Sequence, residues 1–167
     1  VNTVTLATAS DYTGLTTVGA GTLLVANSSG LGAPSTPGSE YSTTIANAAT
    51  ANLQLANDVV LEEEIQFSMK SGTYLRNAGI RSASGTNTLN GPIILTTGGS
   101  VHNFSANAGS KLILNGPMVP STNWTVGFPY HALDGDGEGF VKNGFSNGTS
   151  YNRITNNDIA TESVTSV

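Results

Sequence analysis

The chain has 167 residues, enough for one domain with a hydrophobic core of its own. Only 10% of the residues are charged and the net charge is −5, which excludes the basic surface that nucleic-acid binding requires. Cysteine is absent, so disulfides and thiolate metal sites are excluded as well. Since no apolar run approaches the roughly 18 residues that cross a bilayer, we expect no transmembrane segment.

A degenerate repeat occupies the first two thirds of the chain. Each copy joins two short apolar segments through a turn of small residues and ends at Asn or Gly. The spacing of 27 residues between Val18 and Ile45 lies in the range of solenoid repeats. The three copies contain Val18 with residues 23–25, Ile45 with residues 53–55, and Val101 with residues 112–114.

Short strands separated by Asn and Gly predict a β-solenoid, because each side of a coil is brief and its corners turn sharply. Stacked coils place like residues above one another. Leu and Val are therefore expected in a narrow interior, and Thr and Ser on the outer faces. The first interruption of the pattern, residues 30–39, contains two prolines and predicts a surface loop.

Residues 58–70 combine an apolar run with three consecutive glutamates, Glu62, Glu63 and Glu64. The alternation of apolar and polar residues that follows favours strands, with a short helix as the alternative. A glycosidase-type site needs two carboxylates that face each other, and along a strand only Glu62 and Glu64 share a face. We interpret the three glutamates as a solvated edge rather than a catalytic pair.

From Pro117 onward the repeat fades, and aromatic residues gather around Trp124 and Tyr130. We divide the chain here into solenoid repeats over residues 1–116 and a cap or association segment of the same domain over residues 117–167. Flat rings stack on the apolar faces of sugars, so Trp124 and Tyr130 are the candidate glycan-binding residues. Covering the open end of the solenoid is the alternative that we favour for them.

One segment resembles a known family. Asp11-Tyr12-Thr13-Gly14, followed by residues 16–18 and 20–23, is similar to the autotransporter-associated β-strand repeat, although Asp11 stands where Asn is usual. The resemblance covers about residues 1–116. It implies a right-handed parallel β-helix in a large bacterial surface or secreted protein, with a stalk or scaffold role and no enzyme activity.

The acidic segment that starts at Asp134 is the candidate metal site. Asp134, Asp136 and Glu138 are spaced two apart, and Gly139 stands at the sixth position, as a calcium loop requires. Phe145 occupies the twelfth position, where the EF-hand pattern has a bidentate Glu, so further ligands would have to come from elsewhere. A solvated acidic turn is the alternative interpretation.

Other sites of chemistry receive little support from the sequence. His102 and His131 have no further ligand at zinc spacing, so we expect surface or packed histidines. Nucleophile-elbow and phosphate-loop motifs are absent. Asn-x-Ser/Thr triplets, which are potential glycosylation sites, begin at Asn27, Asn103, Asn123 and Asn147.

The ends of a solenoid carry strand edges that need either a cap or another subunit. We therefore expect a non-enzymatic structural subunit or segment of an extracellular fibre, sheath or surface layer on a bacterium. It would form a homo-oligomer or filament through its ends or by strand exchange. A glycan-binding adhesin module, rigidified by calcium, is the first alternative, and a polysaccharide-degrading β-helix enzyme is the second.

Overall fold

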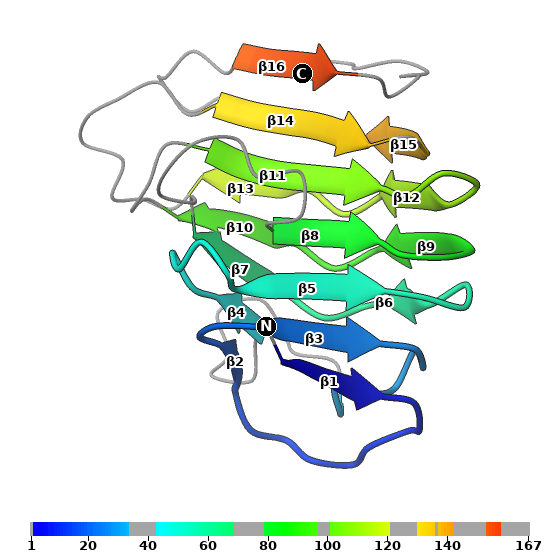
Figure 1. The fold of residues 1–167 in the computed structure, drawn as a ribbon. Helices are drawn as coiled ribbons and strands as arrows, with labels where there is room; N and C mark the ends of the chain where they lie inside the picture. Colours follow the sequence, from blue (N-terminus) through cyan, green and yellow to red (C-terminus); the bar gives the residue numbers. More distant parts are fainter. Residues whose placement is uncertain are drawn as a thin grey trace.

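The computed structural model describes residues 2–33, 43–68, 79–96, 101–120, 130–135, 137–141 and 153–157. Within these ranges the chain forms strands and no helix, and the strands belong to three sheets (Figure 1). Every strand pairing is parallel. The architecture agrees with the predicted all-β class and is compatible with a β-solenoid.

The three sheets are named here A, B and C. Sheet A contains, in spatial order, β1 (Thr3–Leu6), β3 (Thr22–Val25), β5 (Asn52–Leu55), β8 (Gly79–Ser82), β11 (Val101–Ala106), β14 (Tyr130–Gly135) and β16 (Arg153–Asn157). Sheet B contains β2 (Thr16–Val18), β4 (Thr43–Ile45), β7 (Ile65–Ser68), β10 (Ile93–Thr96) and β13 (Met118–Pro120). Sheet C contains β6 (Val60–Leu61), β9 (Thr86–Leu89), β12 (Lys111–Leu114) and β15 (Glu138–Val141).

From β5 onward the chain visits sheets A, C and B in a fixed rotation. The strands β5, β6 and β7 make one such coil, followed by β8, β9 and β10, and then by β11, β12 and β13. Before β5, the described strands belong to sheets A and B only. The first two coils therefore have a third side without a strand of sheet C in the part of the chain that the structure describes.

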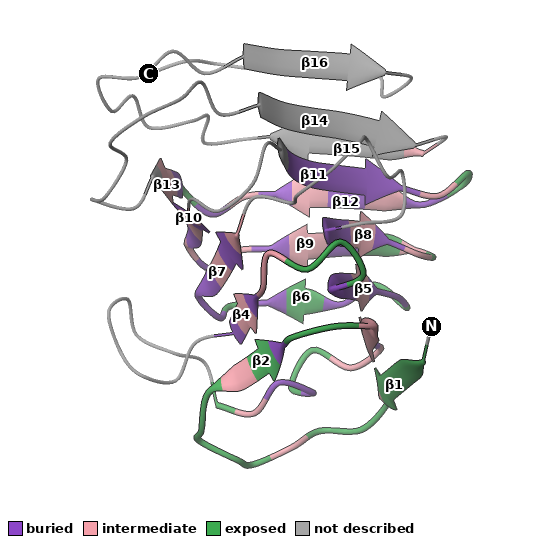
Figure 2. Cartoon of the chain, turned by 60° about the vertical axis from the view of Figure 1, so that its left-hand side comes forward, coloured by how far each residue is buried: buried purple, intermediate pink, exposed green. Residues whose placement is uncertain are grey.

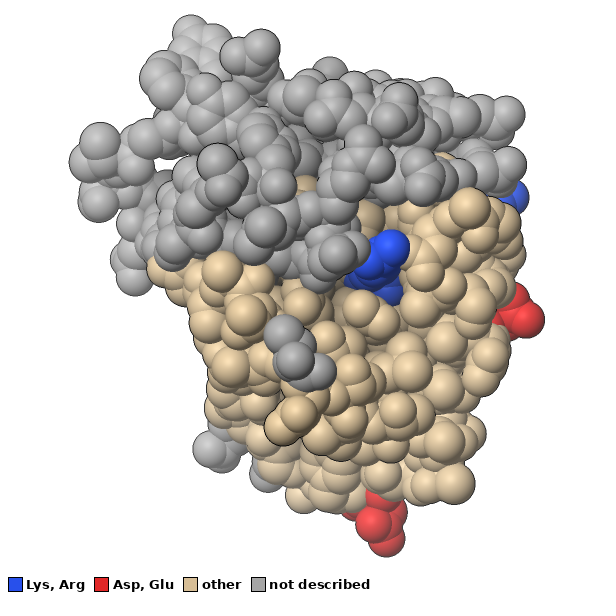
Figure 3. Space-filling view, viewed as in Figure 1, with Lys and Arg blue, Asp and Glu red and all other residues tan. Residues whose placement is uncertain are grey.

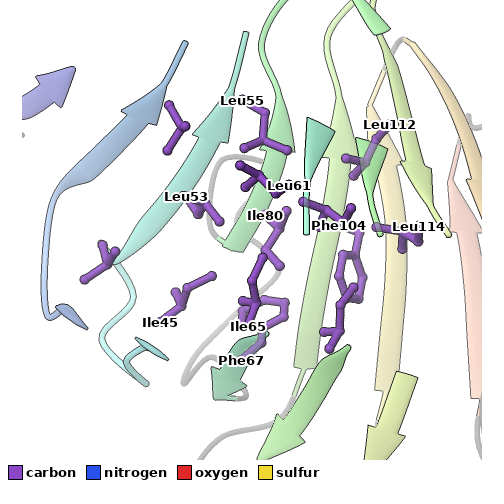
Figure 4. Packing of buried hydrophobic residues seen from close by; sticks show 14 of the residues in the cluster. Ile45, Leu53, Leu55, Leu61, Ile65, Phe67, Ile80, Phe104, Leu112 and Leu114 are labelled. Atoms are coloured by element: carbon purple, nitrogen blue, oxygen red, sulfur yellow. The ribbon is translucent and has the colours of Figure 1, made fainter. Parts of the chain in front are cut away.

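The hydrophobic core lies between the three sheets and is built from rows of side chains at matching positions (Figures 2 and 4). Successive strands pair Leu53 with Ile80 and Ile80 with Phe104 in sheet A. Equivalent rows are Ile45, Phe67 and Leu95 in sheet B, and Leu61, Leu89 and Leu114 in sheet C. These side chains are at most 2% exposed, so the expected narrow interior of apolar residues is confirmed.

The predicted repeat is confirmed for its first two copies. Val18 pairs with Ile45, and residues 23–25 pair with residues 53–55. The third copy is wrong. In the first two copies Val18 and Ile45 lie in sheet B and the second segment lies in sheet A, whereas Val101 lies in sheet A and residues 112–114 lie in sheet C. All three sides of a coil use similar short apolar strands, so the pattern alone does not distinguish one side from the next.

Two further predictions concern the interruptions. In residues 58–68 the favoured strands are confirmed as β6 and β7, and the helix alternative is wrong. Past residue 116, β13, β14, β15 and β16 pair within the same three sheets as the preceding strands. The cap over residues 117–167 stays a prediction, but the sheets extend beyond its first residue. Of the expected loop, residues 34–39 lie outside the described ranges.

The corner between sheets A and C is held by a buried asparagine. The Asn87 amide donates to Ser82 Oγ at 2.7 Å and to the Ser84 carbonyl at 2.8 Å. Its Oδ1 accepts a hydrogen bond from the Val59 backbone N–H of the preceding coil at 2.9 Å. Asn87 is fully buried, so these bonds compensate for the loss of water around its amide.

The corner between sheets C and B stacks backbone directly on backbone. A Cβ atom added at Gly91 would overlap the Glu63 carbonyl, and one added at Gly116 would overlap the Gly91 carbonyl. Beside these glycines, Asn115 Nδ2 donates to Asn90 Oδ1 at 2.8 Å. Asn90 Nδ2 in turn donates to Glu62 Oε1 at 2.6 Å, so one hydrogen-bond chain links three coils.

We predict that Gly91→Ala destabilises the protein by about 1–3 kcal/mol, because the added methyl group pushes against a carbonyl that cannot move without displacing the coil. Urea denaturation followed by circular dichroism measures the change. Gly19→Ala is the matched control, since no atom lies within 4 Å of its added Cβ. Its effect should stay within about 0.5 kcal/mol. Equal losses in the two variants would contradict the stacking argument.

Candidate functional site

The first strands of sheets A and B are edge strands. β1 is the terminal strand of sheet A and pairs only with β3, and β2 is the terminal strand of sheet B and pairs only with β4. Both lie at the same end of the stack, opposite β16 (Figure 1). We call this surface, formed by β1, β2 and the residues between them, the N-terminal end.

The backbone of β1 exposes hydrogen-bonding groups at this end. Thr22 N–H donates to the Asn2 carbonyl at 3.0 Å, and Ala26 N–H donates to the Leu6 carbonyl at 2.9 Å. Because backbone groups of successive residues in a parallel strand point to opposite sides, residues 2, 4 and 6 face β3. The N–H and C=O groups of Thr3 and Thr5 therefore face away from the sheet.

The same reasoning applies to β2. Ala46 N–H donates to the Val18 carbonyl at 3.1 Å, so Val18 faces β4 with its backbone groups. The backbone groups of Thr17 then point away from sheet B. The two edge strands thus present unpaired backbone groups on the same end of the molecule, within the described residues.

The core is open at the N-terminal end. Val4 pairs with Leu23 and so continues the inward row of Leu53, Ile80 and Phe104, yet its side chain is 60% exposed. Leu15, just before β2, is 55% exposed. Figure 2 shows mostly buried strands in the middle of the stack, a mostly exposed β1, and a β2 that is buried only at its last residue. Apolar side chains and open strand edges therefore occur together.

The third side of this end is closed by loop segments. Ser10 N–H donates to the Ser29 carbonyl at 2.9 Å, and Ala33 N–H donates to the Tyr12 carbonyl at 3.2 Å. Above them, the backbone N–H of Val60, in the terminal strand of sheet C, donates to Ser28 Oγ at 2.9 Å. The Ser28 hydroxyl oxygen thus accepts a hydrogen bond from a backbone N–H on the edge of sheet C.

The exposure of the three glutamates differs from the prediction. Glu62 is exposed, but Glu63 is only 6% exposed and Glu64 only 3%, so the interpretation as a solvated edge is wrong for two of the three residues. They lie at the corner between β6 and β7, where each coil covers the one before it. Thr43 Oγ1, fully buried at the start of β4, donates to Glu63 Oε1 at 2.8 Å.

Burial raises the pKa of Glu63 from 4.5 to about 7, and the hydrogen bond from Thr43 lowers it by a smaller amount. A raised pKa suits a general acid, but a glycosidase also needs a second carboxylate facing the same sugar. Glu62 accepts a hydrogen bond from Asn90 on the surface, whereas Glu63 is bound to Thr43 in the interior. Glu64, the residue expected to share a face with Glu62, is only 3% exposed, whereas Glu62 is exposed. Glu62 and Glu64 therefore do not form an exposed pair.

The histidine prediction is confirmed for His102. Its ring is fully buried, with Nε2 at 3.0 Å from the Phe67 carbonyl oxygen and at 3.1 Å from that of Thr96. It also packs edge-on against the Phe67 ring at 5.2 Å between centroids. Although far away in the sequence, His131 is its register partner in β14. No group of three or more metal-binding side chains occurs among the residues whose side chains are described.

The predicted calcium ligands fall at the last described corner between sheets A and C. Asp134 lies in β14, Glu138 begins β15, and Asp136 lies outside the described residues. Between them, Gly137 N–H donates to the Ala106 carbonyl at 3.1 Å, so the segment stacks on the corner below it. The register places Glu138 beside Lys111. Calcium binding stays a prediction.

Of the two predicted ligand-binding aromatics, only Tyr130 lies within the described residues. Tyr130 begins β14 and pairs with Val101 and Arg153, while Trp124 lies outside the described residues. Glycan binding therefore stays a prediction. Of the glycosylation triplets, Asn103 is 1% exposed within β11, so the folded chain does not present it to a modifying enzyme. Asn123 and Asn147 lie outside the described residues.

Nothing in the sequence marks Thr3, Thr5 and Thr17 as edge residues. The alternation of Thr with Val and Leu in residues 3–6 is a signal for a strand, but it is identical in a central strand and an edge strand. The Thr43–Glu63 pair was also missed. Its members are separated by 20 residues, so only the stacking of coils brings them together.

Comparison of the chain with protein-family models, with curated proteins and with solved structures gives no match in any of the three. The resemblance to the autotransporter-associated repeat therefore stays a prediction. Among the residues that the structure describes, no helix is long and apolar enough to cross a membrane.

We predict that the raised pKa of Glu63 makes the protein less stable as the pH rises. Folded Glu63 holds its proton up to about pH 7, whereas the unfolded side chain releases it near 4.5. Its contribution to stability is therefore fully present below pH 4.5 and is lost as the pH rises through 7. Urea denaturation at pH 5 and pH 8 measures this difference.

Glu63→Gln should reduce the stability difference between pH 5 and pH 8, because an amide does not titrate. Glu62→Gln is the matched control: its side chain is exposed, and the new amide oxygen can still accept the hydrogen bond from Asn90. This control should keep the full difference. An unchanged pH dependence in Glu63→Gln would show that another group causes it.

Proposed function

We propose that the chain is a right-handed β-solenoid that serves as a structural subunit or segment of an extracellular fibre, sheath or surface layer of a bacterium. Its ends are the surfaces through which it joins other molecules. Its role is mechanical, and the chain has no enzymatic activity. The exposed continuation of the core row at Val4, beside two open strand edges, is the observation that carries this proposal.

An open edge beside an open core is costly for a protein that stays alone. Edge strands with unpaired backbone groups are templates for pairing, and soluble proteins usually protect them with charges, prolines or bulges. None of these occurs within β1 or β2, whose residues are threonine, valine and leucine. The end is therefore suited to being covered by a partner that supplies both strands and apolar side chains.

The low charge of the face over sheet A is consistent with a scaffold role. Figure 3 shows that the described part of the face over sheet A carries few charged side chains. The outer positions of its central strands hold mainly neutral residues, such as Leu24 and Gln54, with Arg81 as a charged exception. Such a face supplies no strong electrostatic attraction to a charged ligand. The ends of the stack are thus better suited to association than this face.

We predict that wild-type protein associates as its concentration rises and that Val4→Lys weakens this association by about tenfold or more. A lysine in the inward row at the end of the stack would place an unpaired charge in the contact, which costs more than about 1.4 kcal/mol. Sedimentation velocity over a range of concentrations measures the association, and negative-stain electron microscopy shows its form.

The matched control is Gln54→Lys, which adds the same charge to the outer face of β5 in the middle of the stack. This variant should associate like the wild type. A wild-type chain that stays monomeric at every concentration would overturn the proposed function. Equal weakening by the two lysines would assign the effect to net charge instead of to the N-terminal end.

A further inference from the structure

We infer that the partner at the N-terminal end is the C-terminal end of a second copy, whose β16 adds in parallel to β1 so that sheet A continues from one molecule into the next. This inference rests on the proposed function and adds the polarity of the assembly and the strands that meet. Both strands are terminal in sheet A, at its opposite ends.

A single row of register positions connects these two edges. Thr5 pairs with Leu24, and the row passes through successive register partners up to Asp134 and Asn157. The intermediate members are Gln54, Arg81 and Ser105. Placing a second copy one strand spacing below β1 would set its Asn157 beside Thr5. The step between molecules would then repeat the step between coils.

Strand direction favours this polarity. All described strand pairs are parallel, and a second copy stacked in the same orientation preserves that direction in each sheet. A copy turned over to meet the first one N-terminal end to N-terminal end reverses its strands. Its β1 and β2 would have to pair antiparallel, with a different spacing of hydrogen bonds.

The symmetry of the contact also favours the pairing of unlike ends. Contact between two N-terminal ends is isologous, so it gives a dimer that uses up the open end and leaves β16 uncovered. Contact between unlike ends is heterologous and leaves one free end of each kind for further growth. Of these two contacts, only the second covers the edges of both β1 and β16 with a single kind of interface.

The natural absence of cysteine makes the polarity directly testable. Thr5→Cys and Asn157→Cys each place one thiol at one end of this register row. The two variants are prepared separately, then treated with a short bis-maleimide reagent, alone and as an equimolar mixture after dissociation and reassembly. Denaturing gel electrophoresis and mass spectrometry identify the cross-linked dimers. Gln54→Cys, in the middle of the row, is the matched control.

The inference predicts dimers in the mixture that join residue 5 to residue 157, with at least tenfold less dimer in either variant alone or in the control. Abundant dimers from Thr5→Cys alone would overturn the inferred polarity, while association in sedimentation would leave the proposed function standing. Monomeric sedimentation of the cysteine-free wild type would overturn both. Association of the wild type without the mixed dimer would contradict the inference alone.

Discussion

The structure depends on the close stacking of one coil on the next. Neighbouring strands of a sheet lie about 4.8 Å apart, so the corners that connect them must approach to the same spacing. At the corner between sheets C and B this leaves no room for a side chain above the Glu63 and Gly91 carbonyls, and glycine occupies both positions. Where glycine is not used, polar side chains such as Asn87 bond the backbone of the coil below.

This stacking also explains why polar groups are buried in a core of leucine and isoleucine. A corner covered by another coil loses contact with water, and its backbone groups then need partners within the protein. Glu63 shows this most clearly, because its carboxyl group is buried in the stack. The one described hydrogen-bond partner of that carboxyl group is the Thr43 hydroxyl. Its raised pKa follows from the same geometry that places the glycines.

Because each coil is stabilised by the coils next to it, the coils at the ends of the stack bury less apolar surface than those in the middle. Each coil buries its inward row by means of the coils above and below, and the first coil has a described neighbour on one side only. Val4 has the same register position as the fully buried Leu53 and Ile80, but it lies in the terminal strand of sheet A and in a coil without a described strand of sheet C. The proposed end-to-end assembly would supply that missing neighbour, which connects the physics of the core to the function.

The sequence by itself determined the all-β class, the first repeat period and the apolar interior, because these depend on local alternation and on Asn and Gly at corners. It did not determine which sheet a strand joins, as the third copy of the repeat shows, since all three sides have similar strands. It also failed to indicate that Glu63 and Glu64 are buried and that Val4 is exposed. Burial of these residues depends on whether another coil lies against them, and only the tertiary structure decides that.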